Sequence, residues 1–352
     1  MATRREFVGG LAGAVFVGCD GLTARPVRAQ GAPAARRTVT VNGRRLKTVD
    51  VHAHCAFPQA MALMGQQVEP TNLVIAEDRL RAMDEQGVDV EALSINPYWY
   101  KADRDVAQAV ITMQNEKLAA LCAAQPDRFV AFATVALQHP DLAVEQLEAG
   151  VKKLGLRGVS VGSHVEGVEL ADPKFHPVWA KAEELGCLVF IHPVPVPELN
   201  GRLGGSGGLG NTIGFPLDTT IALSHLIFEG TLDRFPGLKI CASHGGGYLG
   251  SYPARSDAVC AAFAGRCTVP LKKQPTEYLR QLYYDSIVFT PEALRHLIAD
   301  VGVGRIVMGT DYPFAWNMKA VDHILATPGA SDADLAAMLG DTAARLLGIK
   351  PA

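Results

Sequence analysis

The sequence lacks several features that would place it in a common non-enzymatic class. It has no run of about 18 or more apolar residues, which argues against a transmembrane helix. Lys and Arg form no block in the body of the chain and the net charge is −3, so the basic surface that a nucleic-acid-binding protein needs is missing. Hydrophobic residues make up 48% of the chain, which is too large a share for a disordered protein.

The seven cysteines are scattered along the chain and include no CxxC pair. A chain of 352 residues needs no disulfide framework for stability, so we expect most of these cysteines to be small buried side chains. Cys260 and Cys267 are the only two that lie close together in the sequence. A disulfide between them is an open possibility in an oxidising compartment.

The first 29 residues have the layout of an export signal. Arg4 and Arg5 precede an apolar and glycine-rich run, and a polar stretch with small residues follows. The paired arginines resemble a twin-arginine signal, a route that exports proteins already folded around a cofactor. We expect cleavage after Ala29, with a lipoprotein-type cut before Cys19 as the alternative. The signal predicts a periplasmic or cell-envelope protein that uses the twin-arginine export machinery; the alternative location is the cytoplasm.

The rest of the chain alternates short β-branched runs with longer segments of helical periodicity. Eight strands, each followed by a helix, predict an α/β protein with a (β/α)8 TIM barrel over residues 48–350, after a linker or strand at 30–47. Ser331–Leu347 is expected as an appended C-terminal helix. A doubly wound open sheet is the alternative, although no GxGxxG follows the first strand. The expected strands are Thr48–His52, Val90–Ile95, Phe129–Val135, Gly158–Val161, Leu188–His192, Lys239–Ser243, Leu282–Asp285 and Ile306–Gly309.

One irregular segment, residues 193–216, follows the fifth expected strand. It contains alternating prolines and then a glycine-rich stretch, and it is too long for an ordinary connection between a strand and a helix. Loops after the strands form the active-site face of a barrel. We therefore expect this segment to be a flexible lid over the active site, with a disordered insertion as the alternative.

Five polar residues lie at the ends of expected strands: His52, His54, His192, His244 and Asp311. Side chains alternate along a strand, so the imidazoles of His52 and His54 point the same way. The carboxyl ends of barrel strands converge on one mouth, where these residues would form a nitrogen and oxygen site for zinc or a similar divalent ion. His164 follows the fourth strand and lines the same pocket or makes a structural hydrogen bond.

The segments around these residues resemble the amidohydrolase superfamily, in the branch that contains 2-amino-3-carboxymuconate-6-semialdehyde decarboxylase and related aromatic-acid decarboxylases. The resemblance covers nearly all of the chain from Val49 to Leu347. It implies that one metal ion, usually zinc, is bound by His52, His54, His192 and Asp311, and that His244 is the catalytic acid or base. It also implies a homodimer in which Arg255 reaches the neighbouring site to hold a carboxylate. The matching segments are Asp50-Val51-His52-Ala53-His54, Gly162-Ser163-His164-Val165, Val189-Phe190-Ile191-His192-Pro193, Ser243-His244-Gly245-Gly246-Gly247 and Gly309-Thr310-Asp311-Tyr312-Pro313-Phe314.

The sequence departs from this branch after the HxH motif. The aminocarboxymuconate enzymes carry a second carboxylate-binding arginine there, whereas no Arg lies between His54 and Ala76 in this chain. One candidate arginine suits a monocarboxylate, such as a hydroxybenzoate-like acid. Aromatic residues that follow the first, second and eighth strands are expected to stack on a flat ring or to pack the loops. They are Phe57, Trp99, Phe314 and Trp316.

These residues predict an enzyme that removes CO2 from a small aromatic or unsaturated carboxylic acid with the help of one divalent ion. Zn²⁺ is the first choice and Mn²⁺ also accepts this ligand set. His244 or Asp311 would deliver a proton to the carbon that loses CO2. The alternative is metal-dependent hydrolysis of a lactone, ester or amide, and a third reading is a protein that only binds a small acid or a metal. Many hydrolases of the superfamily that this chain resembles hold two metals bridged by a carboxylated lysine on the fourth strand. The fourth strand here carries no lysine, which favours one ion.

Overall fold

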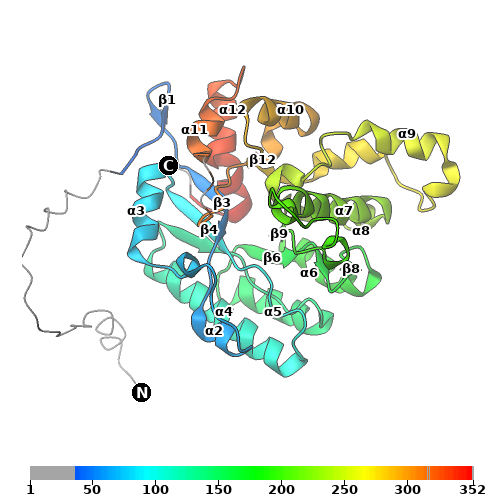
Figure 1. The fold of residues 1–352 in the computed structure, drawn as a ribbon. Coiled ribbons are helices and arrows are strands. Elements are labelled where there is room, and N and C mark those ends of the chain that lie inside the picture. The colour runs from blue at the N-terminus through cyan, green and yellow to red at the C-terminus, as the bar shows by residue number, and fades with distance from the viewer. Residues whose placement is uncertain (1–35, 315, 317, 351–352) are drawn as a thin grey trace, which may run out of the picture. The chain divides into compact units, whose positions relative to one another are not determined.

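The computed structural model describes residues 36–314, 316 and 318–350, so the predicted export signal at 1–29 lies outside the described residues. Eight parallel strands lie in the middle of the described chain with helices around them (Figure 1). The strands form two hydrogen-bonded groups, β3-β4-β5 and β6-β9-β10-β11-β12. They are β3 (Val49–His54), β4 (Val90–Ser94), β5 (Phe129–Ala131), β6 (Gly158–Gly162), β9 (Leu188–His192), β10 (Lys239–Ala242), β11 (Tyr283–Asp285) and β12 (Ile306–Val307).

Parallel bridges at both ends join the two groups into a closed ring. Ala133 pairs with Val159 and so connects the chain after β5 to β6. Asp50 pairs with Met308, and Ala53 with Tyr312, which connects β3 to the chain around β12. The molecule is therefore a (β/α)8 barrel, as predicted, and the open-sheet alternative is excluded. All eight expected strands are present, with ends that differ from the expected ones by a few residues.

Helices connect the strands and begin and end at residues whose chemistry suits a helix terminus. Asp103 accepts a hydrogen bond from Val106 N at the start of α4, and Thr290 accepts one from Ala293 N at the start of α10. Gly87 ends α3 with a φ of 77°. The principal helices are α3 (Glu77–Gln86), α4 (Arg104–Ala124), α5 (Pro140–Lys152), α6 (His176–Leu185), α7 (Phe215–Phe228), α9 (Ala254–Ala262) and α10 (Pro291–Val301), with shorter helices α2 (Pro58–Ala62), α8 (Thr231–Arg234) and α11 (Ala320–Leu325).

The predicted C-terminal helix is present as α12 (Asp332–Ala336) and α13 (Thr342–Leu347), joined by a π-helical turn. Its apolar side chains, among them Ala343 and Leu347, pack in one buried cluster with Val51, Phe132 and Phe190 of the barrel. Gly340 makes this contact feasible, because a Cβ there would lie 1.9 Å from the carbonyl oxygen of Lys47. The appended segment therefore completes the barrel core.

Two features lie outside the barrel pattern. Short antiparallel hairpins form from β1 (Thr40–Val41) with β2 (Arg44–Arg45), and from β7 (His164–Val165) with β8 (Val168–Glu169). Helix α9 projects away from the rest of the described chain (Figure 1), and none of its residues is buried. A disulfide joins Cys260 to Cys267 beside this helix, as the sequence allowed.

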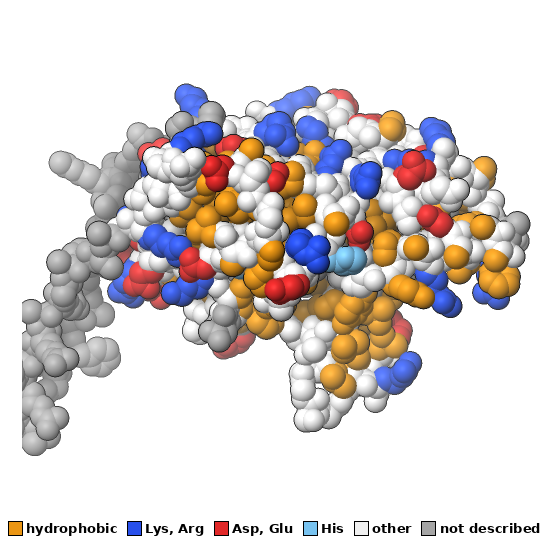
Figure 2. All heavy atoms as spheres, turned by 90° about the horizontal axis from the view of Figure 1, so that it is seen from above, with side chains coloured by type: hydrophobic (Ala, Val, Ile, Leu, Met, Phe, Trp, Pro, Cys, Tyr) orange, Lys and Arg blue, Asp and Glu red, His pale blue; other side chains and the backbone are white. Residues whose placement is uncertain are grey.

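Surface charge and helix hydropathy are two further properties of the described residues. On the face drawn in Figure 2, Lys and Arg side chains are interspersed with Asp and Glu and form no continuous basic patch. Among the described residues, no helix is both long and apolar enough to span a bilayer.

Candidate metal centre and catalytic cavity

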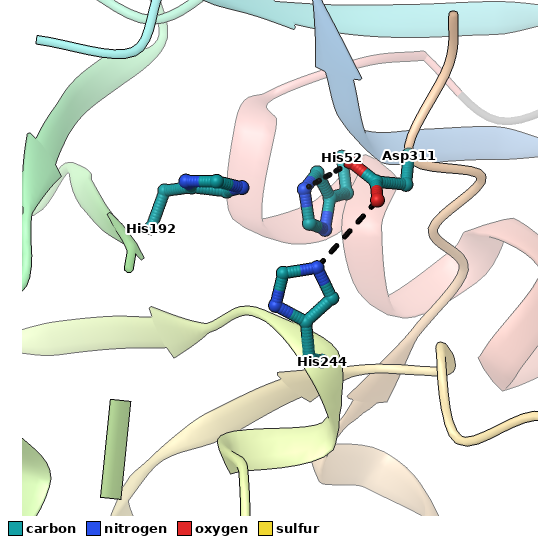
Figure 3. Close-up of side chains that lie close together, drawn as sticks. All are labelled: His52, His192, His244 and Asp311. Carbon is teal, nitrogen blue, oxygen red and sulfur yellow. Dashed lines mark ion pairs between the residues drawn. The ribbon is translucent and has the colours of Figure 1, made fainter. Parts of the chain in front are cut away.

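The polar residues at the strand ends meet at one end of the barrel. His52 and His54 lie on β3, His192 ends β9, and His244 and Asp311 follow β10 and β12. The ligand atoms of His52, His192, His244 and Asp311 all lie within 4.8 Å of one another (Figure 3). The ring nitrogen Nε2 of His54 joins them, 2.9 Å from His52 Nε2 and 3.0 Å from Asp311 Oδ1. The structure thus brings together all five residues that the sequence singled out.

Each of the three expected histidine ligands has a hydrogen-bond partner on its other ring nitrogen. His192 Nδ1 donates to the carbonyl oxygen of Pro193 at 2.8 Å. The hydroxyl of Ser94 donates to the carbonyl of Ala53, so it accepts a hydrogen bond from His54 Nδ1 at 3.0 Å. These contacts place the lone pairs of Nε2 toward the common centre. Partners of this kind fix the tautomer and the ring orientation of metal-binding histidines.

The buried carboxylate of Asp285 is a further member of the site that sequence reasoning missed. Its Oδ2 accepts from His52 Nδ1 at 2.6 Å and from the backbone N–H of His244 at 2.9 Å. Its Oδ1 accepts from the backbone N–H groups of Gly245 and Ile287. One side chain therefore orients a candidate ligand and the turn that carries His244. The available signal was its place at the end of an expected strand, the same signal that identified Asp311.

The pKa values in the metal-free chain reflect the crowding of these groups. Burial lowers the pKa of His52, but the charge of Asp311 and hydrogen bonds to Asp285 and Asp311 outweigh it and raise that pKa to about 10. Burial lowers the pKa of His54 to about 4 and that of His192 well below its usual value. Burial raises the pKa of Asp311, but the His52 charge and three histidine hydrogen bonds more than reverse this and lower it strongly. Asp311 therefore remains a carboxylate and His54 and His192 remain neutral, the forms in which these groups bind a metal ion.

The backbone is strained where His244 and Asp311 leave their strands. His244 has a φ of 52° and Asp311 a φ of 60°, a region that non-glycine residues rarely adopt. The glycines after His244 allow a tight turn, since a Cβ on Gly247 would lie 2.0 Å from the carbonyl oxygen of Pro216. The Nδ1 atom of His244 is buried and has no hydrogen-bond partner among the described residues. An unsatisfied nitrogen in such a position fits a bound molecule.

Two cavities flank His244. The metal chamber has a volume of about 440 Å³ and lies over His192, His244 and Asp311. The second chamber has a volume of about 420 Å³, adjoins the metal chamber and lies against α10. Four residues line both chambers: Asn211, Phe215, His244 and Trp316. Asn211 belongs to the segment that we expect to be a lid, which stays a prediction.

The structure corrects the prediction that Trp99 contacts the substrate. Its side chain has an exposed fraction of 0% and packs in the hydrophobic core. Its indole N–H donates to the carbonyl oxygen of Val135 at 2.9 Å. Phe57 likewise packs against the core and lines neither chamber, whereas Phe314 and Trp316 line the metal chamber, where stacking on a flat ring stays a prediction. Of the four aromatic residues, two therefore reach the site.

His164 and Arg255 lie away from both chambers. His164 Nδ1 accepts from the backbone N–H of Gly167, and its Nε2 lies 3.9 Å from Asp218 Oδ1, which favours the structural role that the sequence left open. Arg255 is exposed on α9 and its guanidinium forms no ion pair within the described part of the chain. It contributes nothing to the site of its own barrel in this single chain.

The sequence profile of the amidohydrolase family matches residues 49–349. This chain belongs to the amidohydrolase family. The match begins at the strand that carries His52 and His54 and ends after the C-terminal helix, so it covers the whole barrel.

Its relatives within the family are decarboxylases. The chain is 30% identical to 2-amino-3-carboxymuconate-6-semialdehyde decarboxylase of Dictyostelium discoideum, over 86% of this chain and 85% of that protein. It is 33% identical to gamma-resorcylate decarboxylase of a Rhizobium species, over 71% and 79%. These homologues are carboxy-lyases that act without an oxidant on unsaturated or aromatic carboxylic acids.

Solved structures give the same result. The 5-carboxyvanillate decarboxylase of Sphingomonas paucimobilis superposes with a TM-score of 0.79 at 27% identity, covering 87% of this chain and 100% of that one. A dihydroxybenzoic acid decarboxylase from a Polaromonas species, solved with manganese and 2-nitroresorcinol, superposes with a TM-score of 0.78 at 27% identity, covering 86% and 97%. The predicted family and barrel are thereby confirmed.

The network around Asp285 yields a prediction about metal binding. Asp285→Asn removes the negative charge that holds His52 and frees the turn that carries His244. We expect the affinity for Zn²⁺ or Mn²⁺ to fall by about 10- to 100-fold, the usual cost of losing such a partner. Metal titration against a competing chelator measures it. The control is Asp341→Asn, an exposed carboxylate far from β11 in sequence; equal affinity for both variants would contradict the assigned role.

Proposed function

We propose that this protein is a metal-dependent non-oxidative decarboxylase of an aromatic or unsaturated carboxylic acid. The observation that carries the proposal is the convergence of His52, His54, His192 and Asp311 at the base of a cavity that His244 also lines. The decarboxylases among its relatives support the same reaction class.

The donor set suits one divalent ion held by His52, His54, His192 and Asp311. Nitrogen and carboxylate oxygen ligands fit both Zn²⁺ and Mn²⁺. His52 Nε2, His54 Nε2 and Asp311 Oδ1 lie 2.9–3.1 Å from one another. Donor atoms this close together could all bind one ion. The bound ion would supply Lewis acidity toward the oxygens of an acidic substrate.

Residues of the chain would deliver the proton that replaces CO2 on the substrate carbon. In the proposed reaction the bond between the substrate carbon and its carboxylate carbon breaks, CO2 leaves, and the electron pair stays on the substrate carbon. That carbon then takes up one proton. His244 and Asp311 both line the metal chamber, and 3.6 Å separates His244 Nε2 from Asp311 Oδ2. At this distance one water molecule between them would let the pair exchange a proton, which His244 would then deliver to the carbon.

The substrate's negative charge needs a positive partner besides the metal. Among the described residues that line the two chambers there is no Lys or Arg. Exposed Arg255 lies on α9, which projects from the barrel and buries none of its own residues (Figure 1). We propose that two copies form a homodimer in which Arg255 of each copy reaches the other's site and binds a carboxylate oxygen.

We also propose that the protein is exported through the twin-arginine route to the periplasm or cell envelope. The Arg4-Arg5 pair and the apolar run behind it support the signal. The Cys260–Cys267 disulfide adds support, because such bonds persist in oxidising compartments and are rare in the cytosol.

Two substitutions test the assigned roles of His244 and Asp311. His244→Asn should lower turnover by about 10²- to 10⁴-fold while the metal stays bound, because the expected ligands are intact. Asp311→Ala should lose both metal and turnover. Protein without residues 1–29, loaded with Zn²⁺ or Mn²⁺, is incubated with hydroxybenzoic acids, lactones and esters. Mass spectrometry detects the products, and elemental analysis gives the metal content.

The outcomes of this experiment distinguish the two reaction classes and test the roles of His244 and Asp311. Loss of CO2 from an acid, absent in His244→Asn, is the expected result. Addition of water to a lactone or ester, with every acid unchanged, would replace the decarboxylase by the hydrolase alternative. Wild-type turnover in His244→Asn would overturn the role of that residue. Full metal occupancy in Asp311→Ala would remove Asp311 from the ligand set.

Mixed dimers test the role of Arg255. Arg255→Ala should lower kcat/KM about 100-fold, whereas Arg266→Ala, on the same projecting segment, should change it less than about twofold. Co-expression of Arg255→Ala with His244→Asn places an intact His244 and an intact Arg255 at one site of each mixed dimer. We expect activity well above the sum of the two variants. No recovery would mean that Arg255 does not act across the dimer.

A further inference from the structure

The two chambers together offer more space than an acid with a single ring requires. A small-molecule site usually occupies about 300–1,000 Å³, so the metal chamber of about 440 Å³ already holds a monocyclic acid. The second chamber adds about 420 Å³ next to it. It is separate from the candidate metal ligands, since His52, His54, His192 and Asp311 do not line it.

The lining of the second chamber is neutral and rich in aromatic groups. None of the described residues that line it is Asp, Glu, Lys or Arg. Aromatic rings come from the start of α7, the turn after His244, the loop before α10 and the loop after β12. Aliphatic side chains complete the walls. Such a lining favours an uncharged flat or apolar group over a charged one. The aromatic residues are Phe215, Tyr248, Phe289 and Trp316.

Phe289 is held in an unusual position at this chamber. Its φ is 64°, a left-handed conformation that is a genuine outlier for a bulky residue. Its ring has an exposed fraction of 50% and meets the ring of Trp316 edge-on, 5.2 Å between centroids. Backbone strain that presents an apolar ring to a cavity is typical of ligand-binding positions.

Trp316 connects the second chamber to the reacting groups. Its ring lines both chambers, and its indole N–H donates to Asp311 Oδ2 at 2.6 Å. Asp311 Oδ2 also lies 3.6 Å from His244 Nε2. A substrate group in the second chamber would therefore contact Trp316, whose indole N–H is hydrogen-bonded to Asp311 of the proposed proton-transfer pair.

We infer that the substrate is an extended acid: its carboxylate-bearing part lies in the metal chamber, and an uncharged aryl or alkyl substituent occupies the second chamber. This inference rests on the proposed decarboxylase function and narrows its substrate class. The second chamber selects the substituent by shape and apolar contact, because none of the described residues in its walls is Asp, Glu, Lys or Arg. Even one methylene in such a pocket is worth about 10- to 200-fold in discrimination.

The experiment compares 2-hydroxybenzoic acid with its 4-phenyl and 5-phenyl derivatives. With wild-type, metal-loaded protein, kcat/KM for one phenyl derivative should exceed that of the parent acid by about tenfold or more. Ala293→Trp fills the second chamber from α10, and Ser251→Phe fills it from the segment that follows the His244 turn. Each should remove the preference for the extended acid and leave kcat/KM for the parent acid within about twofold. Ala299→Trp, exposed on the same helix and outside the lining, is the matched control.

A binding measurement separates failure of this inference from failure of the proposed function. Titration calorimetry with the same acids gives their affinities whether or not CO2 is released. Tighter binding of a phenyl derivative, lost in Ala293→Trp and kept in Ala299→Trp, supports the chamber even if no acid is decarboxylated. Equal binding of the parent and both derivatives overturns the inference. So does a change in oligomeric mass in Ala293→Trp without a change in preference, because the chamber would then be a contact between subunits.

Discussion

The pairing of β3 with the chain that follows β12 is the contact on which the rest of the site depends. The N–H of Asp311 donates to the carbonyl of His52 at 2.8 Å, and the N–H of His54 donates to the carbonyl of Tyr312 at 2.7 Å. These bonds close the barrel and place the first and last strands side by side. The two histidines of the HxH motif and the distant carboxylate thereby become neighbours. Buried Asp50 reinforces the closure, since it accepts from His52 N and from both the N–H and the hydroxyl of Thr310.

The barrel and the convergence of the five polar residues could be predicted because both follow from local pattern. Buried parallel strands are short β-branched runs, and their carboxyl ends must meet at one mouth. A polar residue at such an end, as at His192 or Asp311, is therefore placed by topology alone. The same reasoning applies to Asp285, which ends β11 and has the same burial as His52. The sequence therefore carries the same signal for Asp285 as for Asp311.

The contrast between Trp99 and Trp316 marks where prediction from sequence ends. Both follow a strand, and nothing in the local sequence distinguishes them. The difference is the acceptor that each indole N–H finds, the backbone carbonyl of Val135 in the core for Trp99 and Asp311 Oδ2 in the cavity for Trp316. That choice depends on the path of each loop over several residues, which no periodicity records. The same holds for the positive φ of Phe289 and for the neutral lining of the second chamber.

The absence of Lys and Arg from the described residues that line the two chambers bears on the chemistry as well as on selectivity. A carboxylate is costly to move from water into apolar surroundings, whereas CO2 carries no charge. As the carbon–carbon bond breaks, the localised charge of the carboxylate spreads into the remaining unsaturated system. Walls such as Phe215 and Phe314, without Lys or Arg beside them, would stabilise the spread charge better than the localised one. Positive charge confined to a metal centre, and to an arginine from a second copy, would bind the substrate without cancelling that advantage.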